Sequence, residues 1–180
     1  RWVVDRYDKM KADATDWLNI IDEVAKYVAP QKSDVMSWVS QDLRSISGNL
    51  YDDTAVKAND VLAAGSMANM TPINEIWYAG VPPAGLSENE EAVQWYAKCG
   101  EIMRQEMARS NFYTESLGVL QDRGWAGTSA MYSELHNGSL WFKHFEAGHF
   151  LIDEDDRGVV DTVARCIKFT HRQAEKKFGR

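Results

Sequence analysis

The feature that most constrains the fold is a run of small side chains within residues 53–72. Apolar residues recur there at helical spacing, and residues 62–68 read Leu-Ala-Ala-Gly-Ser-Met-Ala. Asp53 suits the N-cap, because its carboxylate can accept from free backbone N–H groups of the first turn. Pro72 ends the pattern, since proline disfavours a helical backbone in the residue before it. A helix with so little side-chain area fits where other backbones approach closely, so we expect a central, buried, tightly packed helix.

Further helices are predicted on both sides of this one. Residues 3–29 keep the spacing of an amphipathic helix up to Pro30. Ser87 and Glu90 have the spacing of a capping box at the start of a helix that runs to about Arg109, and another helix covers residues 112–125. The side chains expected to face inward from the helix over 87–109 are Ala92, Trp95, Tyr96, Cys99, Ile102, Met103 and Met107.

The segments between these helices are not expected to be helical. The polar residues 31–52 predict a mobile loop. Residues 76–81 are expected to form one short strand before the Pro82-Pro83 turn.

After residue 127 the pattern changes from helical to alternating. Residues 128–136 and 140–145 read as paired strands, because Asn137-Gly138 between them is a strong hairpin signal. Further strands are expected over 150–152 and 159–169, with a polar turn over 153–158. Thr170 and Gln173 form a second capping box, which opens a helix that Gly179 ends.

This order of elements predicts an α+β fold in a single domain over residues 1–180. N-terminal helices (1–126) are followed by an antiparallel β-meander (127–169) and the start of a short terminal helix (170–180). The 180 residues, 44% of them hydrophobic, suffice for one compact domain. The chain starts at Arg1 and both ends look cut, so we expect a fragment of a longer protein.

Composition excludes several classes of protein. No run of about 18 apolar residues could span a membrane, and no pattern reads as a secretory signal. Two cysteines, Cys99 and Cys166, give no disulfide framework and favour a reducing compartment. The net charge of −7 argues against a general nucleic-acid binder, and the seven tryptophans lack the interleaved Arg and Lys of a single-strand platform.

Two motifs resemble reactive sites but lack what the chemistry requires. Ser129 follows Gly127 as in a nucleophile elbow, yet Met131 stands where the elbow needs a second glycine. Residues 153–158 resemble the start of a calcium loop, but Arg157 occupies a ligand position and Ala164 replaces the bidentate glutamate. We therefore predict a solvated hairpin turn there and no nucleophile at Ser129.

Three histidines of the predicted meander, His136, His144 and His149, could converge on a metal ion, but their spacing does not fix the distances between them. No phosphate-binding glycine loop is present, and Cys99 has no histidine at a helical offset and should fill core space. The residues alone therefore identify no catalytic, cofactor or metal site, and we predict that the chain is not an enzyme.

A series of landmarks, in order along nearly the whole chain, resembles the head-to-tail connecting (portal) proteins of short-tailed bacteriophages. The first part of the series comprises residues 6–13, Trp17, residues 24–30, Asp53-Thr-Ala55, residues 62–65, Met70-Thr-Pro72 and Trp77. The second part comprises Ser110-Asn-Phe-Tyr113, residues 124–128 and residues 170–179.

The resemblance implies a subunit of a dodecameric ring at one capsid vertex, through which double-stranded DNA is packaged and later ejected. It implies docking to terminase, capsid and tail proteins, residence in the virion after assembly in the host cytoplasm, and no catalytic residues, cofactor or membrane. Members are several hundred residues long, so the chain would be the N-terminal, wing-region part, with the stem, clip and C-terminal regions beyond it. Trp2, Trp38 and Trp141 are candidates for subunit contacts, because the sequence gives them no clear core register.

Two other functions stay open from the sequence. One is a metal-dependent hydrolase on the meander, with His136, His144 and Asp153 as its site. The other is a scaffold or adaptor that binds protein without forming a ring.

Overall fold

The computed structural model describes residues 2–32, 52–165 and 167–179. The helical part contains α1 (Trp2–Asp13), α2 (Thr15–Val28), the 3-10 turn η1 (Pro30–Lys32), α4 (Thr54–Met70), the 3-10 turn η2 (Ala84–Leu86), α5 (Glu90–Arg109) and α6 (Phe112–Ala126). The remainder contains β1 (Ala130–His136), β2 (Ser139–Phe145), β3 (Leu151–Glu154), β4 (Val160–Ala164) and α7 (His171–Phe178). The α+β class predicted from the sequence is confirmed. The loop predicted over 31–52 lies almost entirely outside the described residues.

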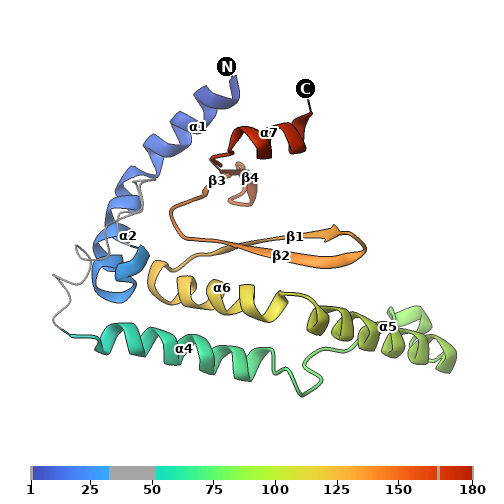
Figure 1. Ribbon diagram of the computed structural model, residues 1–180. Coiled ribbons are helices and arrows are strands. Elements are labelled where there is room, and N and C mark those ends of the chain that lie inside the picture. Colours follow the sequence, from blue (N-terminus) through green and yellow to red (C-terminus); the bar gives the residue numbers. More distant parts are fainter. Residues whose placement is uncertain (1, 33–51, 166, 180) are drawn as a thin grey trace.

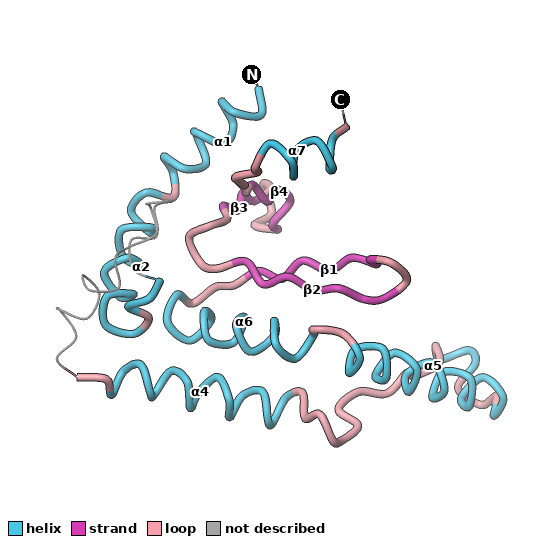
Figure 2. Tube along the Cα trace, in the orientation of Figure 1, coloured by secondary structure: helices cyan, strands magenta, loops and turns pink. Residues whose placement is uncertain are grey.

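Helix α6 is the element around which the others are arranged (Figure 1). The β1–β2 hairpin packs on one side of it and α4 on the other, while α2 lies at one end and α5 extends away from the other end. Both termini of the described chain lie on the same side of the molecule, beside β3 and β4 (Figure 2). The hydrophobic core sits where α1 and α2 meet the end of α6 and the segment that follows β2. Its buried members are Met10, Leu18, Ile21, Ala25, Ala29, Trp125, Ala126, Ala147 and Leu151.

Local turn and capping signals are confirmed at two places. The β1–β2 hairpin pairs His136 with Ser139, so Asn137 and Gly138 form a two-residue loop with φ of 50° and 78°. Positive φ at both positions is the geometry that Asn-Gly favours. At α7, the Thr170 hydroxyl accepts from the Gln173 N–H at 3.4 Å and the Gln173 side chain accepts from the Thr170 N–H at 2.9 Å.

Three expectations about helix ends are wrong. The segment 3–29 is two helices, interrupted at Ala14, where the Thr15 hydroxyl donates to the Lys11 carbonyl, a bond that bends helices. Asp53 makes no side-chain cap bond; Asp52 accepts from the Thr54 N–H at 2.9 Å instead. Helix α5 is capped by Asn89, which accepts from the Ala92 N–H at 3.2 Å, so Ser87 and Glu90 form no capping box.

The burial expected of the helices is also wrong in part. In α4 Ala63 is buried, whereas Val61 and Leu62 are 72% and 57% exposed, because α6 and α2 pack against α4 and its other sides face solvent. In α5, Trp95, Ile102 and Met103 are exposed rather than inward, and Cys99 is half-buried. Helix α5 extends away from the core (Figure 1), and much of its apolar surface is exposed in the described structure.

The strands differ from the prediction in number and length. Residues 76–81 form an irregular loop packed on α5 and α6, where Trp77 stacks on Phe112 and the Tyr78 hydroxyl donates to the Gly100 carbonyl at 3.3 Å. The meander consists of two separate two-stranded antiparallel sheets, β1–β2 and β3–β4. The strand expected over 159–169 ends at Ala164 as β4.

Candidate functional site

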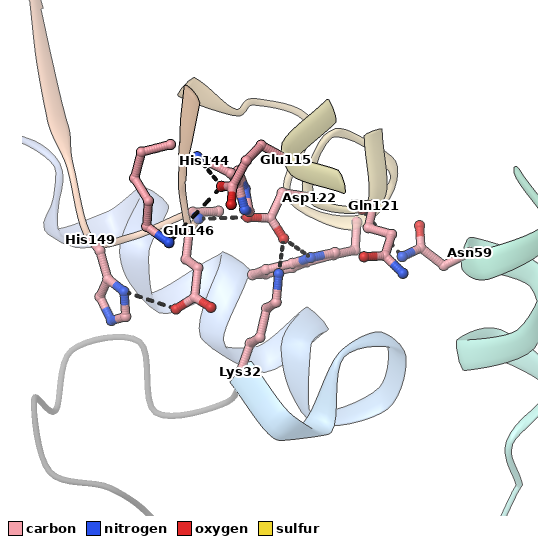
Figure 3. Close-up of polar contacts among 11 residues, drawn as sticks. Lys32, Asn59, Glu115, Gln121, Asp122, His144, Glu146 and His149 are labelled. Carbon is pink, nitrogen blue, oxygen red and sulfur yellow. Dashed lines mark hydrogen bonds and ion pairs between the residues drawn. The ribbon is translucent and has the colours of Figure 1, made fainter. Parts of the chain in front are cut away.

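A buried carboxylate, Asp122 of α6, joins separate parts of the chain (Figure 3). Its Oδ1 accepts from Lys32 Nζ at 2.6 Å and from Trp125 Nε1 at 3.0 Å. Its Oδ2 accepts from the Ala147 backbone N–H at 2.9 Å and lies 2.8 Å from His144 Nε2. Asp122 has no exposed surface, so these partners replace water completely. One side chain thus connects the end of the α2–η1 segment, α6, β2 and the loop after β2.

The electrostatic state of Asp122 follows from this environment. Burial raises the pKa of its carboxyl group, but hydrogen bonds from His144, Lys32 and the Ala147 N–H, together with the Lys32 charge, outweigh burial and lower the pKa from 3.8 to about 2. A carboxylate with such a pKa stays ionised near neutral pH and is a poor general base. The contacts of Asp122 are therefore those of a residue that holds segments of the chain together, not those of a catalytic base.

A second carboxylate lies beside the first cluster. Glu146 Oε2 is 3.2 Å from His149 Nδ1. The hydrogen bond from His149 lowers the pKa of Glu146 against the effect of burial, and the charge of Lys32 lowers it further. Lys32 thus stabilises the negative charge of both Asp122 and Glu146.

The close approach of β2 to α6 depends on a glycine. A Cβ atom built on Gly118 of α6 would lie 2.7 Å from His144 Nδ1, inside contact distance. The absence of a side chain at Gly118 lets the imidazole lie over α6 and reach Asp122. A similar contact holds α4 against α6: a Cβ on Gly124 would collide with Asn59, whose Nδ2 donates to the Gln121 carbonyl at 3.2 Å.

Side chains at the start of α6 also bind the backbone of β2 directly. Asn111 Nδ2 donates to the Phe142 carbonyl at 2.7 Å, and its Oδ1 accepts from the Phe142 N–H at 2.9 Å. One turn further on, Glu115 Oε2 accepts from the His144 N–H at 2.6 Å. These side chains take the place of a neighbouring strand along the outer edge of β2.

The structure does not bring together the residues that were considered as metal ligands. His136 ends β1 at the tip of the hairpin, whereas His144 pairs with Met131, five residues or roughly 17 Å along the strand. Asp153 bonds to Arg6 at 3.2 Å, and His149 pairs with Glu146. Within the described ranges, no group of three His, Cys, Asp or Glu side chains is arranged to hold a metal ion.

The other two motifs lie in loops. Ser129 is in the loop between α6 and β1, where its buried Oγ has no hydrogen-bond partner among the described residues, although a serine nucleophile needs a base to activate it. Asp155 Oδ1 accepts from the backbone N–H groups of Arg157 and Val159, at 2.8 and 2.9 Å. That bonding confirms the predicted polar turn between β3 and β4.

The tryptophans predicted to make subunit contacts lie in different settings. Trp2, at the start of α1, is 71% exposed. Trp141 of β2 is 38% exposed, on the face of the hairpin opposite to the one that packs on α6. Trp38 lies outside the described residues.

Sequence reasoning missed Asp122, Lys32 and Asn111. Their partners are distant in sequence, so no spacing rule connects them. One signal was present in hindsight: Asp122 lies three residues before Trp125, on the same helix face as apolar residues. An acid on such a face is seldom buried without partners.

No helix in the described part of the chain is both long and apolar enough to cross a bilayer.

Comparison with known proteins identifies the family. The family model described as bacteriophage head to tail connecting protein matches residues 3–180. A relative named "Probable portal protein", from Bordetella phage BPP-1, is 25% identical over 182 residues. That match covers 99% of this chain and 32% of the relative, so the chain spans about a third of its length. The family is a structural one. This chain, matched over nearly all its residues, belongs to the bacteriophage head-to-tail connecting proteins.

Proposed function

We propose that the chain is the N-terminal, wing-region part of a structural subunit that assembles into a dodecameric portal ring at one capsid vertex. The observation that carries the proposal is the family match over residues 3–180, which agrees with the order of landmarks along the sequence. The chain corresponds to about a third of its relative, so the ring, the channel and the docking partners belong to the whole protein.

The exposed apolar surface supports assembly with other chains. Exposed apolar residues are ordinary one at a time, but a high number of large ones favours contacts with other chains. Many large apolar side chains are more than half exposed on α1, α4, the loop after α4 and α5. They are Trp2, Val3, Val4, Val61, Leu62, Met70, Ile73, Ile76, Val81, Trp95, Ile102 and Met103. We propose that subunit contacts cover part of this surface, with Trp2, Trp38 and Trp141 among the contact residues.

In this function the ring is the conduit through which double-stranded DNA enters and leaves the capsid, docked first to terminase and later to tail proteins. The net charge of −7 suits a conduit that does not retain phosphate. The protein would assemble in the host cytoplasm and remain in the virion. No step requires catalysis by this chain.

The test is the mass and symmetry of the full-length protein, measured by analytical ultracentrifugation and negative-stain imaging. Rings of about a dozen subunits with a central hole are expected, because a contact between two different patches closes a ring. A monomer or dimer at every concentration would overturn the proposal and leave the non-ring adaptor as the better reading.

A further inference from the structure

The β1–β2 hairpin has one covered edge and one open edge. Asn111 binds both the N–H and the carbonyl of Phe142, and Glu115 binds the N–H of His144. Helix α6 therefore covers the outer edge of β2. Figure 1 shows β2 beside α6 and β1 on the far side of the hairpin.

The register shows which groups lie on the open edge. Phe142 and His144 direct their backbone groups to α6, so their partners Ser133 and Met131 form non-hydrogen-bonded pairs with them. By the same alternation, the N–H and carbonyl groups of Met131, Ser133 and Leu135 point outward from β1. Within the described residues, no backbone or side-chain group hydrogen bonds to these outward groups.

β1 also lacks most of the features that usually protect an edge strand, and Glu134 is its one acidic side chain. Its seven residues contain no proline and no lysine, and its pairing with β2 is continuous without a bulge. Met131, Ser133 and Leu135 are exposed, Leu135 by 73%. An edge of this kind is a template for another strand.

The same chain holds a second, different open edge at β4. Among the described residues β4 pairs with β3 alone, and its Val160 and Val163 are exposed. A cavity of about 480 Å³ lies between α1 and this strand, lined by residues 162–165 and by α1 side chains that include Trp2 and Tyr7. Residues 162–164 belong to β4, so the cavity lies along this strand.

We propose that β1 of one copy pairs with the β4 edge of the adjacent copy, so that the two hairpins join into one sheet across the subunit boundary. An isolated two-stranded sheet is only marginally stable. Pairing β1 of one copy with β4 of the next would join two such sheets into one sheet of four strands. The two edges belong to different sheets of the same chain, which is the heterologous arrangement that closes a ring. The inference rests on the proposed ring function.

The first experiment maps the contact by cross-linking. A photo-reactive benzoylphenylalanine replaces Leu135 in the full-length protein, and a matched variant carries it at Lys143, on the strand held by α6. Irradiated rings of the Leu135 variant should give cross-linked dimers joined to residues 159–165, identified by mass spectrometry. The Lys143 variant should give at least several-fold less of that product. Cross-links from position 135 to another region, to another protein or to none would overturn the inference.

The second experiment removes one outward N–H. Ser133→Pro leaves every bond of the β1–β2 ladder in place, because the Ser133 N–H points away from β2. Glu134→Pro is the matched control, since the Glu134 N–H belongs to the ladder and its loss should destabilise the hairpin itself. Ser133→Pro should unfold at a denaturant concentration near the wild-type value yet raise the protein concentration needed for ring assembly at least tenfold.

The outcomes separate this inference from the function on which it rests. If wild-type protein forms no rings, the proposed function fails. If rings form and the Leu135 cross-links do not reach residues 159–165, only the strand pairing fails. Normal ring assembly by Ser133→Pro would overturn the pairing as well, and should that variant fold poorly, the cross-linking result decides.

Discussion

At the scale of single residues, Asp122 links several separate segments of the chain. Its two oxygens take partners from η1, α6, β2 and the loop after β2, and none of this carboxylate is exposed. Removing one member of a buried ion pair leaves the other charge without compensation, which costs about 3–5 kcal/mol. Asp122→Asn should therefore lower the free energy of unfolding by about 3 kcal/mol in urea titrations at pH 7. Glu106→Gln, at an exposed pair with Arg109, should change it by less than about 1 kcal/mol.

The same variant gives a pH prediction. The pKa of Asp122 is about 2 in the folded state and near its ordinary 3.8 in the unfolded chain, so the unfolded state binds the proton more tightly. The contribution to stability, about 2 kcal/mol, is present above pH 4 and is lost as the pH falls from about 4 to 2. The difference between wild type and Asp122→Asn should shrink across that window. A constant difference would contradict this account of the carboxylate.

Replacing a glycine inside a helix with alanine should have opposite effects on stability at Gly118 and at Gly65. Gly118→Ala places a Cβ 2.7 Å from His144 Nδ1 and forces the ring away from Asp122, so we expect a loss of about 1–3 kcal/mol despite better helix propensity. Gly65→Ala in α4 meets nothing within 4 Å and should stabilise by up to about 1 kcal/mol. Urea unfolding of the two variants measures both. Equal effects would show that Gly118 makes no special room for the imidazole.

At the scale of elements, the hairpin depends on its attachment to α6. Asn111→Ala removes both bonds to the backbone of Phe142, a buried residue, and unsatisfied buried groups cost about 1–3 kcal/mol each. We expect a loss of about 2 kcal/mol or more, with faster amide exchange at Phe142 measured by NMR. Asn111→Asp keeps the acceptor and should restore the protection of the Phe142 amide in part. Unchanged exchange in both variants would show that the β2 edge is held by other contacts.

The elements that the sequence predicted well are those with local signals. The Asn137-Gly138 turn and the Thr170–Gln173 capping box each depend on residues within four positions of one another, and the structure has both. The predicted strand over 76–81 failed for a non-local reason. An apolar run becomes a strand only beside a free edge, and here residues 76–81 lie against α5, where a Cβ on Gly80 would be 2.5 Å from the Tyr96 carbonyl oxygen.

The candidate site was harder to predict than the fold. His144 was noticed as a possible metal ligand, but its partner Asp122 carries no motif, and Lys32 is 90 residues away from it in sequence. Burial of α4 was overestimated, because small side chains indicate close packing without saying which faces are packed. Val61 and Leu62 show that helical spacing alone cannot distinguish a buried face from an exposed one.

At the scale of the whole molecule, few large side chains are fully buried and many are exposed along α1, α4 and α5. Association that covers such surface stabilises the folded state by mass action. For the full-length protein we therefore expect the melting temperature to rise by several degrees as the protein concentration is raised a hundredfold, measured by differential scanning fluorimetry. A melting temperature independent of concentration would indicate that each chain is stable without neighbours.

The Asp122 connection also has a mechanical consequence. In the proposed ring, the parts of each subunit would have to transmit load, and a hairpin attached only at its ends would peel away one bond at a time. Here the charged contacts at Asp122 and the backbone contacts at Asn111 and Glu115 lie side by side along one strand. In the proposed ring, a pull on the hairpin would be shared among these contacts, so the hairpin and α6 would move together and pass the load on to the neighbouring subunit.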